Sequence, residues 1–369
     1  MSNKYSGKKV ILGFTGSPLS CLTVRLLQEQ GMKISAFFFT CDEWSNMIKI
    51  NQFEKNYVME KATELGIELT VEDISAVFFP RVIDSSISDR ISGKFSSTYW
   101  LSKLTIFEYL HYKFVHEKAD YVAVSSFTRM DQEGTVFKGK ELSLDQSPLM
   151  FLLKDKLKHF MFPVGTLLKK DIIHLSYELK IETMDDYLSN SKKTGAAFSL
   201  KPFYEFLKFY IPSFLRGRGQ VISFQEYVIG FHEGGVYNAS IGERFDYTAT
   251  KGKGAVSDLD AEVVLDIRPD ENVIIMGPSK MLLRKRAIAR NVVWLSDPLF
   301  SEPRKIQVVF DNGASETAHI FYALGNSVLI DFDKITLHAS RGRYVAFYNG
   351  DILIGGGRIS VPIREERYI

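Results

Sequence analysis

The first half of the chain alternates short apolar runs with stretches that carry apolar residues at helical spacing. The apolar runs have the length of strands and are residues 9–14, 34–39, 68–71 and 121–124. The helical stretches are residues 20–30, 48–65 and 100–118. This alternation predicts a parallel sheet covered by helices on both faces. In that architecture, ligands bind beyond the carboxyl ends of the strands.

The pattern changes after about residue 202. One more helix is expected over residues 202–210, and beyond Arg216 the chain becomes short apolar runs broken by glycine-containing turns such as Asn349-Gly350. The expected strands are residues 220–224, 262–266, 273–276, 305–310, 319–322, 327–331, 344–348 and 351–354. This pattern predicts an all-β second half made of one or two small barrels or sandwiches.

Composition narrows the class of protein. The 369 residues suggest two or three domains at roughly 100–200 residues each. A hydrophobic content of 45% and a charged content of 24% exclude disordered and fibrous classes, and a net charge of +2 demands no nucleic-acid partner by itself. Only two cysteines are present, which excludes a disulfide scaffold and a cysteine-only zinc site. No apolar run approaches the ~20 residues that span a bilayer, and the polar N-terminus lacks a signal-peptide pattern, so we expect a cytoplasmic protein.

The turn after the first expected strand is a candidate phosphate site. It reads Thr15-Gly16-Ser17-Pro18-Leu19-Ser20 and precedes a helix, whose N-terminal amides favour anions. It matches neither G-x-G-x-x-G nor G-x-x-x-x-G-K-[ST]. The alternative interpretation is an ordinary turn in which Ser20 caps the helix.

Several later motifs occur in a family-specific order. They are Ala119-Asp120-Tyr121-Val122-Ala123, then Arg129, Asp145-Gln146-Ser147, Phe162-Pro163-Val164-Gly165, the set Gly230, His232 and Gly234, Ser240-Ile241-Gly242-Glu243-Arg244, Phe347-Tyr348-Asn349-Gly350 and Gly355-Gly356-Gly357. Together with the first turn, which is similar to a PP-loop, they resemble the tRNA-specific 2-thiouridylase family (MnmA/TrmU) over nearly the whole chain.

The resemblance implies an α/β plus all-β fold. A Rossmann-like PP-loop domain of the adenine nucleotide alpha hydrolase-like type would span residues 1–201, a small central domain residues 202–271, and a C-terminal β-barrel domain residues 272–369. It also implies chemistry on tRNA in two stages. ATP adenylates O2 of the wobble uridine, and a cysteine persulfide then displaces AMP with the help of a second cysteine.

The resemblance further implies two sets of binding residues and no metal ligands. ATP or AMP would be held by Thr15, Gly16, Ser17, Ser20, Phe39 and Arg129. Basic side chains would meet tRNA phosphates at Lys103, Lys193, Arg244, Arg284, Lys285, Arg286 and Arg343. The alternative interpretation of each basic cluster is ordinary solvated surface charge.

Departures from the family fall on its chemistry. Leu19 stands at the PP-loop aspartate position, and leucine cannot ligate Mg²⁺. Leu101 and Ala197 stand at the two cysteine positions, and neither can form a persulfide. The family's P-N-P-D segment is replaced by Phe95-Ser96-Ser97-Thr98, and the G-H of its G-H-Y-A-R motif by Ser125-Ser126.

The two cysteines present lie elsewhere. Cys21 follows the turn at a helix N-terminus, where the helix dipole would lower its pKa, and Cys41 follows the second expected strand. They are either relocated catalytic thiols or two small buried apolar residues. Three functional hypotheses remain open. The chain is a non-thiolating RNA-binding or regulatory paralogue, an active ATP-dependent transferase with relocated residues, or a protein-interaction module of the translation or tRNA-modification machinery.

Overall fold

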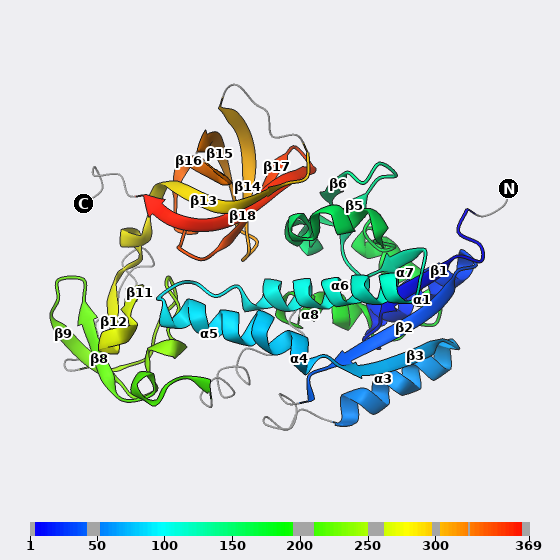
Figure 1. Ribbon diagram of the computed structural model, residues 1–369, viewed down its shortest axis with the longest axis horizontal. Coiled ribbons are helices and arrows are strands. Elements are labelled where there is room, and N and C mark those ends of the chain that lie inside the picture. The colour runs from blue at the N-terminus through cyan, green and yellow to red at the C-terminus, as the bar shows by residue number, and fades with distance from the viewer. Residues whose placement is uncertain are drawn as a thin grey trace. The chain divides into compact units, whose positions relative to one another are not determined.

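The computed structural model describes residues 4–42, 52–194, 210–249, 262–296, 303–323 and 325–363. The chain forms two compact units, each built from several segments (Figure 1). The first unit comprises Met1–Arg81, Tyr99–Ser199 and Asp351–Ile354, and the second comprises Val82–Thr98, Leu200–Gly350 and Gly355–Ile369. The segment Val82–Thr98 therefore leaves the first unit and belongs with residues far later in the sequence.

The first unit contains a five-stranded sheet in which every neighbouring pair is parallel. Its order is β3-β2-β1-β4-β7. The bounds are β1 (Lys9–Gly13), β2 (Lys33–Thr40), β3 (Glu68–Asp73), β4 (Tyr121–Ala123) and β7 (Phe160–Met161). The apolar runs of the first half thus predicted four of these strands, and the α/β fold class is confirmed.

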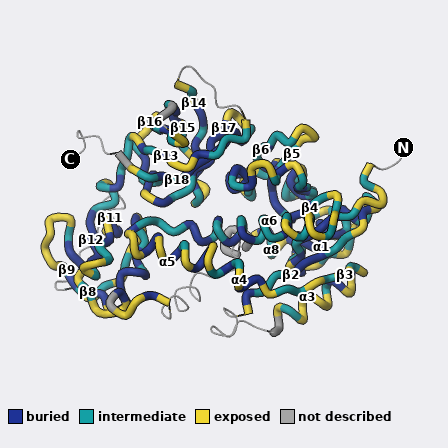
Figure 2. Tube along the Cα trace, viewed as in Figure 1, coloured by how far each residue is buried: buried dark blue, intermediate teal, exposed yellow. Residues whose placement is uncertain are grey.

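Two apolar clusters hold the helices, and one of them includes residues of the sheet. The helices of this unit are α1 (Pro18–Glu29), α3 (Gln52–Leu65), α4 (Ser75–Phe78), α6 (Thr98–His116), α7 (Lys169–Glu178) and α8 (Met184–Thr194). One cluster joins α1 and α3 to the strands through Val24, Val58 and Val10. Buried and exposed positions alternate along α3, as its amphipathic role requires (Figure 2). The other cluster joins the opposite face of α1 to α7 and α8 through residues that include Leu22 and Ile172.

Elsewhere in the described part of the first unit lie a hairpin and 3-10 segments. The hairpin strands are β5 (Thr128–Met130) and β6 (Val136–Lys138), and Ile352 pairs with Phe137 of β6. The 3-10 segments are Leu142–Leu144 and Ser147–His159, and a π-helical turn spans Phe79–Ile83 at the passage into the second unit.

The second unit contains a five-stranded sheet and a barrel. The sheet has the order β10-β9-β8-β12-β11, with bounds β8 (Gly219–Ser223), β9 (Val228–His232), β10 (Thr248–Ala249), β11 (Glu262–Arg268) and β12 (Val273–Pro278). The barrel strands are β13 (Arg284–Trp294), β14 (Arg304–Phe310), β15 (Ser315–Ala323), β16 (Ser327–Thr336), β17 (Tyr344–Asn349) and β18 (Ile352–Ile363). They follow the order β13-β16-β15-β14-β17-β18, and pairing of β18 with β13 closes the ring. The expected C-terminal β-barrel is confirmed.

Helix α5 (Asp84–Ile91) joins the second unit through the segment Val82–Thr98. Arg90 Nη1 donates to the carbonyl of Tyr237 at 2.6 Å, and the Phe95 amide donates to the carbonyl of Arg341 at 2.9 Å. One short segment therefore contacts both the five-stranded sheet region and the barrel.

Two helices expected from the sequence lie partly or almost wholly outside the described residues. The helix expected over 202–210 lies outside them except for Tyr210, and the helix expected from residue 48 is described from Gln52 onward. Among the helices that the structure describes, none combines the length and the apolar character needed to cross a bilayer.

Candidate nucleotide site and the fate of the family's catalytic positions

The turn between β1 and α1 is ordered by its own hydroxyl groups. Ser17 is the N-cap of α1, and its Oγ accepts from the Ser20 amide at 3.3 Å. The Thr15 and Ser17 hydroxyls lie 3.0 Å apart. The capping residue is therefore Ser17, and the expectation that Ser20 caps this helix is wrong. Gly16 has φ +68°, and a Cβ there would lie 3.2 Å from the Tyr57 ring, so this position requires glycine.

The backbone of this turn keeps free donors. Within the described part of the chain, the amides of Thr15, Gly16 and Ser17 have no hydrogen-bond acceptor. They lie beyond the carboxyl end of β1 and before the positive end of the α1 dipole, where phosphate oxygens are favoured. The turn therefore retains the backbone features of an anion site.

Leu19 does not face this anion site. Its side chain is 3% exposed and belongs to the apolar cluster that also contains Val164, Met184 and Leu188. A hard cation needs oxygen ligands, which an aliphatic side chain cannot supply. The position that the resemblance assigns to an aspartate thus contributes to the packing of α1 against α8. Among the described residues, no group of three or more His, Cys, Asp or Glu could hold a metal ion.

Tyr187 contacts the turn from another helix, and Tyr99 and Lys103 form a separate pair on α6. Tyr187 of α8 forms a side-chain hydrogen bond with Ser17. Burial raises the pKa of Tyr99 on α6, and the nearby Tyr187 raises it further. Lys103, one turn further along α6, has its Nζ 4.8 Å from the centre of the Tyr99 ring. Burial lowers the pKa of Lys103 to about 8.

Lys103 is among the RNA contacts expected from the sequence, whereas neither Tyr99 nor Tyr187 is a residue that the sequence singles out. The spacing of Tyr99 and Lys103, four residues apart on one helix, is a signal that could have paired them. No such signal exists for Tyr187, because it is brought to the turn only by the tertiary packing of α8.

Neither cysteine has the environment of a nucleophile. Cys21 lies in the apolar cluster beneath α3, and burial raises its pKa to about 11. The expectation that the α1 dipole lowers this pKa is wrong, because desolvation of the thiolate dominates. Cys41 is also buried, and the Ser75 hydroxyl lies 3.5 Å from its Sγ.

The two remaining residues expected to bind a nucleotide contact other residues of this chain. Phe39, near the carboxyl end of β2, packs edge-on against Tyr109 with ring centres 5.2 Å apart. Arg129 of β5 donates from Nε to the carbonyl of Lys138 at 2.7 Å, and its Nη2 lies 3.5 Å from Asp351 Oδ2. Phe39 and Arg129 thus lie on elements of the same unit as the turn, and their role toward a nucleotide stays a prediction.

Of the two positions that the resemblance assigns to cysteines, the structure describes only the first. Leu101 lies half-buried in α6, where its carbonyl accepts from the Thr105 hydroxyl at 2.8 Å. Ala197 lies outside the described residues. Lys193 lies in the last turn of α8, and its side chain is also outside the description.

The predicted RNA contacts of the second unit are partly neutralised. Lys285 and Arg286 of β13 share Asp331, at 3.1 and 3.2 Å. Arg284 donates to the carbonyls of two nearby residues, and Arg244 is exposed. Arg343 differs from these, since its side chain is 11% exposed and bonded to a buried aspartate.

Comparison with known proteins covers both units. A family model described as "tRNA methyl transferase HUP domain" matches residues 8–191, and one described as "Aminomethyltransferase beta-barrel domain" matches residues 284–359. The chain is 26% identical over 376 residues to tRNA-specific 2-thiouridylase MnmA 1 of Caldanaerobacter subterraneus, covering 96% of this chain and 99% of the relative. It is 24% identical over 379 residues to tRNA-specific 2-thiouridylase MnmA of Clostridioides difficile, with 96% and 99% covered.

A solved structure titled as a predicted subunit of tRNA methyltransferase from Methanocaldococcus jannaschii aligns with a TM-score of 0.32 and 17% identity, over 46% of this chain and 75% of that one. The two family models and the full-length relatives agree with the order of the motifs and with the fold of both units. The chain therefore belongs to the tRNA-specific 2-thiouridylase family.

Proposed function

We propose that this protein binds tRNA without thiolating it, and that it keeps an anion site at the turn of residues 15–17. The observation that carries the proposal is the burial of Leu19 in the cluster between α1 and α8. Adenylation of a uridine by ATP draws on a divalent cation at the phosphates, and the side chain at this position offers no oxygen. Leu19, which replaces the oxygen ligand, is thus part of the packing between two helices and is not an exposed side chain.

The environments of the two cysteines also argue against persulfide chemistry. A persulfide carrier must present a thiolate, and a pKa of about 11 keeps Cys21 protonated at neutral pH. Cys41 is buried beside Ser75. These environments support the interpretation of both cysteines as packing residues, which weakens the alternative of an active transferase with relocated thiols.

tRNA as the partner follows from family membership. The relatives that align along nearly the full chain are named as tRNA-specific enzymes, and both units of this chain match them. This coverage supports a protein that keeps a tRNA-holding scaffold and carries other residues at the positions matched to the family's reacting groups. Such a protein would act as an RNA-binding or regulatory paralogue.

Two measurements on the full chain test the proposal. Crosslinking in cells followed by sequencing should enrich particular tRNAs, and expression in a strain that lacks its thiouridylase should not restore wobble 2-thiouridine. Restored 2-thiouridine would overturn the proposal, and its loss in Cys21→Ala or Cys41→Ala would then identify a relocated thiol. Co-purification with proteins but no tRNA enrichment would instead favour a protein-interaction module.

A further inference from the structure

We propose that the hairpin tip between β8 and β9, residues 223–228, is a docking site for a partner protein whose contacting segment combines apolar side chains with lysine or arginine. The inference goes beyond the proposed function, because it concerns the five-stranded sheet of the second unit and a protein rather than tRNA. Three properties of the hairpin tip support it, namely exposed apolar side chains, a well-bonded turn and an acidic rim.

The hairpin tip exposes three large apolar side chains close together. Residues 224–228 are all exposed. Tyr227 is 68% exposed, and Phe224 and Val228 are each 43% exposed. Phe224 also leans on the sheet, because a Cβ on Gly277 of β12 would lie 3.1 Å from its ring. Grouped apolar side chains at a surface are typical of interaction sites, and tyrosine is enriched among the residues that dominate binding between proteins.

Hydrogen bonds hold the hairpin tip in one conformation. The Ser223 amide donates to the carbonyl of Tyr227 at 2.8 Å, and the Glu226 amide donates to the carbonyl of Ser223 at 2.9 Å. The Ser223 hydroxyl accepts from the amides of Gln225 and Tyr227, both at 3.3 Å. A turn that is already formed loses little conformational entropy when a partner binds, so more of the contact energy appears as affinity.

Glu226 adopts a backbone conformation that is unusual for its residue type. Its φ of +66° lies in the left-handed region, which glycine or asparagine normally occupies in such a turn. Strain of this kind persists where surrounding contacts fix it. Here Arg268 of β11 donates two hydrogen bonds to the Glu226 carboxylate, at 2.6 and 3.1 Å. The strained turn is therefore held from outside, with the Tyr227 side chain beside it in solvent.

The rim of the hairpin tip is acidic. Arg268 lies 3.8 Å from Glu271 in addition to its pair with Glu226. The hydrogen bond with Glu226 raises the pKa of Arg268, and the charges of Glu271 and Asp266 raise it further. Three carboxylates thus surround one guanidinium, and these four groups carry a net charge of −2. Such a rim repels nucleic-acid phosphates and favours a partner that brings lysine or arginine beside its apolar residues.

Photocrosslinking in the cells that make this protein identifies the partner. The full chain carries p-benzoylphenylalanine in place of Tyr227 or, as a control, in place of Tyr177 of α7, which is 71% exposed. Position 227 should give one discrete protein adduct that position 177 does not give. Mass spectrometry should map the adduct to a segment with apolar residues and a net positive charge. Adducts with tRNA or with a second copy of this chain, an acidic segment, or no adduct specific to position 227 would overturn the inference.

Calorimetric titration with the purified partner tests the contacts themselves. Tyr227→Ser should weaken binding at least about tenfold, while Tyr177→Ser, the matched control, should bind like the wild type. Glu271→Lys should weaken binding more at low salt than at high salt, because its effect is a change of surface charge. Equal affinity in wild type and Tyr227→Ser, or an affinity that Glu271→Lys leaves unchanged at low salt, would overturn the inference.

Two further measurements separate docking from folding and from tRNA binding. Tyr227 and Glu271 are both exposed, so Tyr227→Ser and Glu271→Lys should keep the melting temperature of the wild type. Tyr227→Ser should also enrich the same tRNAs as the wild type in the crosslinking experiment of the proposed function. Failure of the docking inference would therefore leave the tRNA-binding proposal standing, and the reverse also holds.

Discussion

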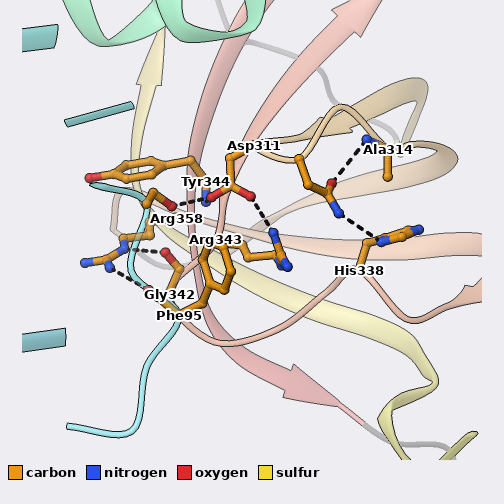
Figure 3. A network of polar contacts seen from close by, with 10 residues as sticks. Phe95, Asp311, Ala314, His338, Gly342, Arg343, Tyr344 and Arg358 are labelled. Carbon is orange, nitrogen blue, oxygen red and sulfur yellow. Dashed lines mark hydrogen bonds and ion pairs between the residues drawn. The ribbon is translucent and has the colours of Figure 1, made fainter. Parts of the chain in front are cut away.

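The guanidinium carbon of Arg343 lies 3.7 Å from the centre of the Phe95 ring, while its Nη1 donates to Asp311 Oδ1 at 2.8 Å (Figure 3). Ser97 also donates to Asp311. Residues 95–98 replace the P-N-P-D segment that the resemblance places before the first cysteine position. This segment is therefore fixed to the barrel by Arg343 and Asp311.

Arg358 provides a second attachment of the same segment. Its Nε donates to the carbonyl of Gly342 at 2.6 Å, and its Nη2 donates to the carbonyl of Phe95 at 3.3 Å (Figure 3). Nη2 also donates to Asp89. Two arginines of the barrel thus bind both ends of the stretch from Asp89 to Phe95. These contacts hold the stretch within the second unit.

Removal of Arg343 should destabilise the fold strongly. Asp311 is 2% exposed, and Arg343→Ala would leave its carboxylate buried without a cation. Loss of one partner of a buried pair costs about 3–5 kcal/mol. Urea unfolding monitored by circular dichroism measures this. Arg286→Ala is the control, because the Arg286 side chain is 48% exposed and Lys285 would still pair with Asp331, so the loss should cost less than about 1 kcal/mol.

The same two variants test the sequence prediction that Arg343 contacts tRNA. Because this guanidinium is bonded inward, tRNA affinity per folded molecule should not change in Arg343→Ala. The exposed Arg286 remains available for phosphate, so Arg286→Ala should weaken binding and reduce its salt dependence. Weaker tRNA binding by a fully folded Arg343→Ala would contradict this assignment.

Strands with simple apolar runs could be predicted from the sequence. Strand β13 could not, because it lacks such a run. It is an 11-residue strand whose basic residues at positions 284, 285, 286 and 290 read as a surface charge cluster. Its inward side chains are mostly small, including the buried Ala287 and Ala289, so the run carries little hydrophobic signal. Closure of the barrel, which buries these alanines, is a tertiary effect that local pattern does not encode.

The candidate site was predictable where it depends on chain-local features. The position of the turn at residues 15–17 follows from a strand, a glycine and a helix in succession. The environment of Cys21 does not, because α3 buries the thiol and that desolvation outweighs the helix dipole. Tyr187 lies 170 residues after Ser17, and only packing of α8 on α1 brings the two together.

Restoring an aspartate at position 19 should not restore a metal site. The side chain would enter the cluster that contains Met184 and Leu188, where an ionised carboxylate has no partner. Leu19→Asp should therefore lower the free energy of unfolding by at least the roughly 2–5 kcal/mol typical of Leu→Ala in a core. Leu142→Asp, at an exposed leucine, should change it by less than about 0.5 kcal/mol. A stable Leu19→Asp variant that gains Mg²⁺-dependent ATP binding would refute this assignment.

Cys21 should resist alkylation in the folded protein. Its pKa of about 11 leaves a very small thiolate fraction at pH 7.5, compared with an ordinary thiol of pKa near 8.5. Iodoacetamide should modify it more than about a hundredfold more slowly in buffer than in urea. Mass spectrometry of the peptides separates its modification from that of Cys41. Rapid labelling of Cys21 in the native state would revive the relocated-thiol hypothesis.

The His111–His159 pair should make stability depend on pH. His111 Nε2 and His159 Nδ1 lie 2.9 Å apart, so at least one of the two facing nitrogens must be unprotonated. Burial lowers the pKa of both rings. The neighbouring His159 and Lys156 lower the pKa of His111 further, and Glu108 opposes them. Lys158 lowers the pKa of His159 further.

Because these folded-state pKa values lie below the unfolded value near 6.5, the unfolded chain binds more protons as the pH falls. The pair's contribution to stability is therefore present above pH 6.5 and is lost progressively below it.

His159→Gln keeps a hydrogen-bonding group that does not titrate, so it should flatten the fall in unfolding free energy between pH 7 and pH 5. The exposed His174 on α7 gives the matched control, and His174→Gln should keep the wild-type slope. Urea unfolding at half-unit pH steps measures the three slopes, and an equal slope in wild type and His159→Gln would show that other groups cause the pH dependence.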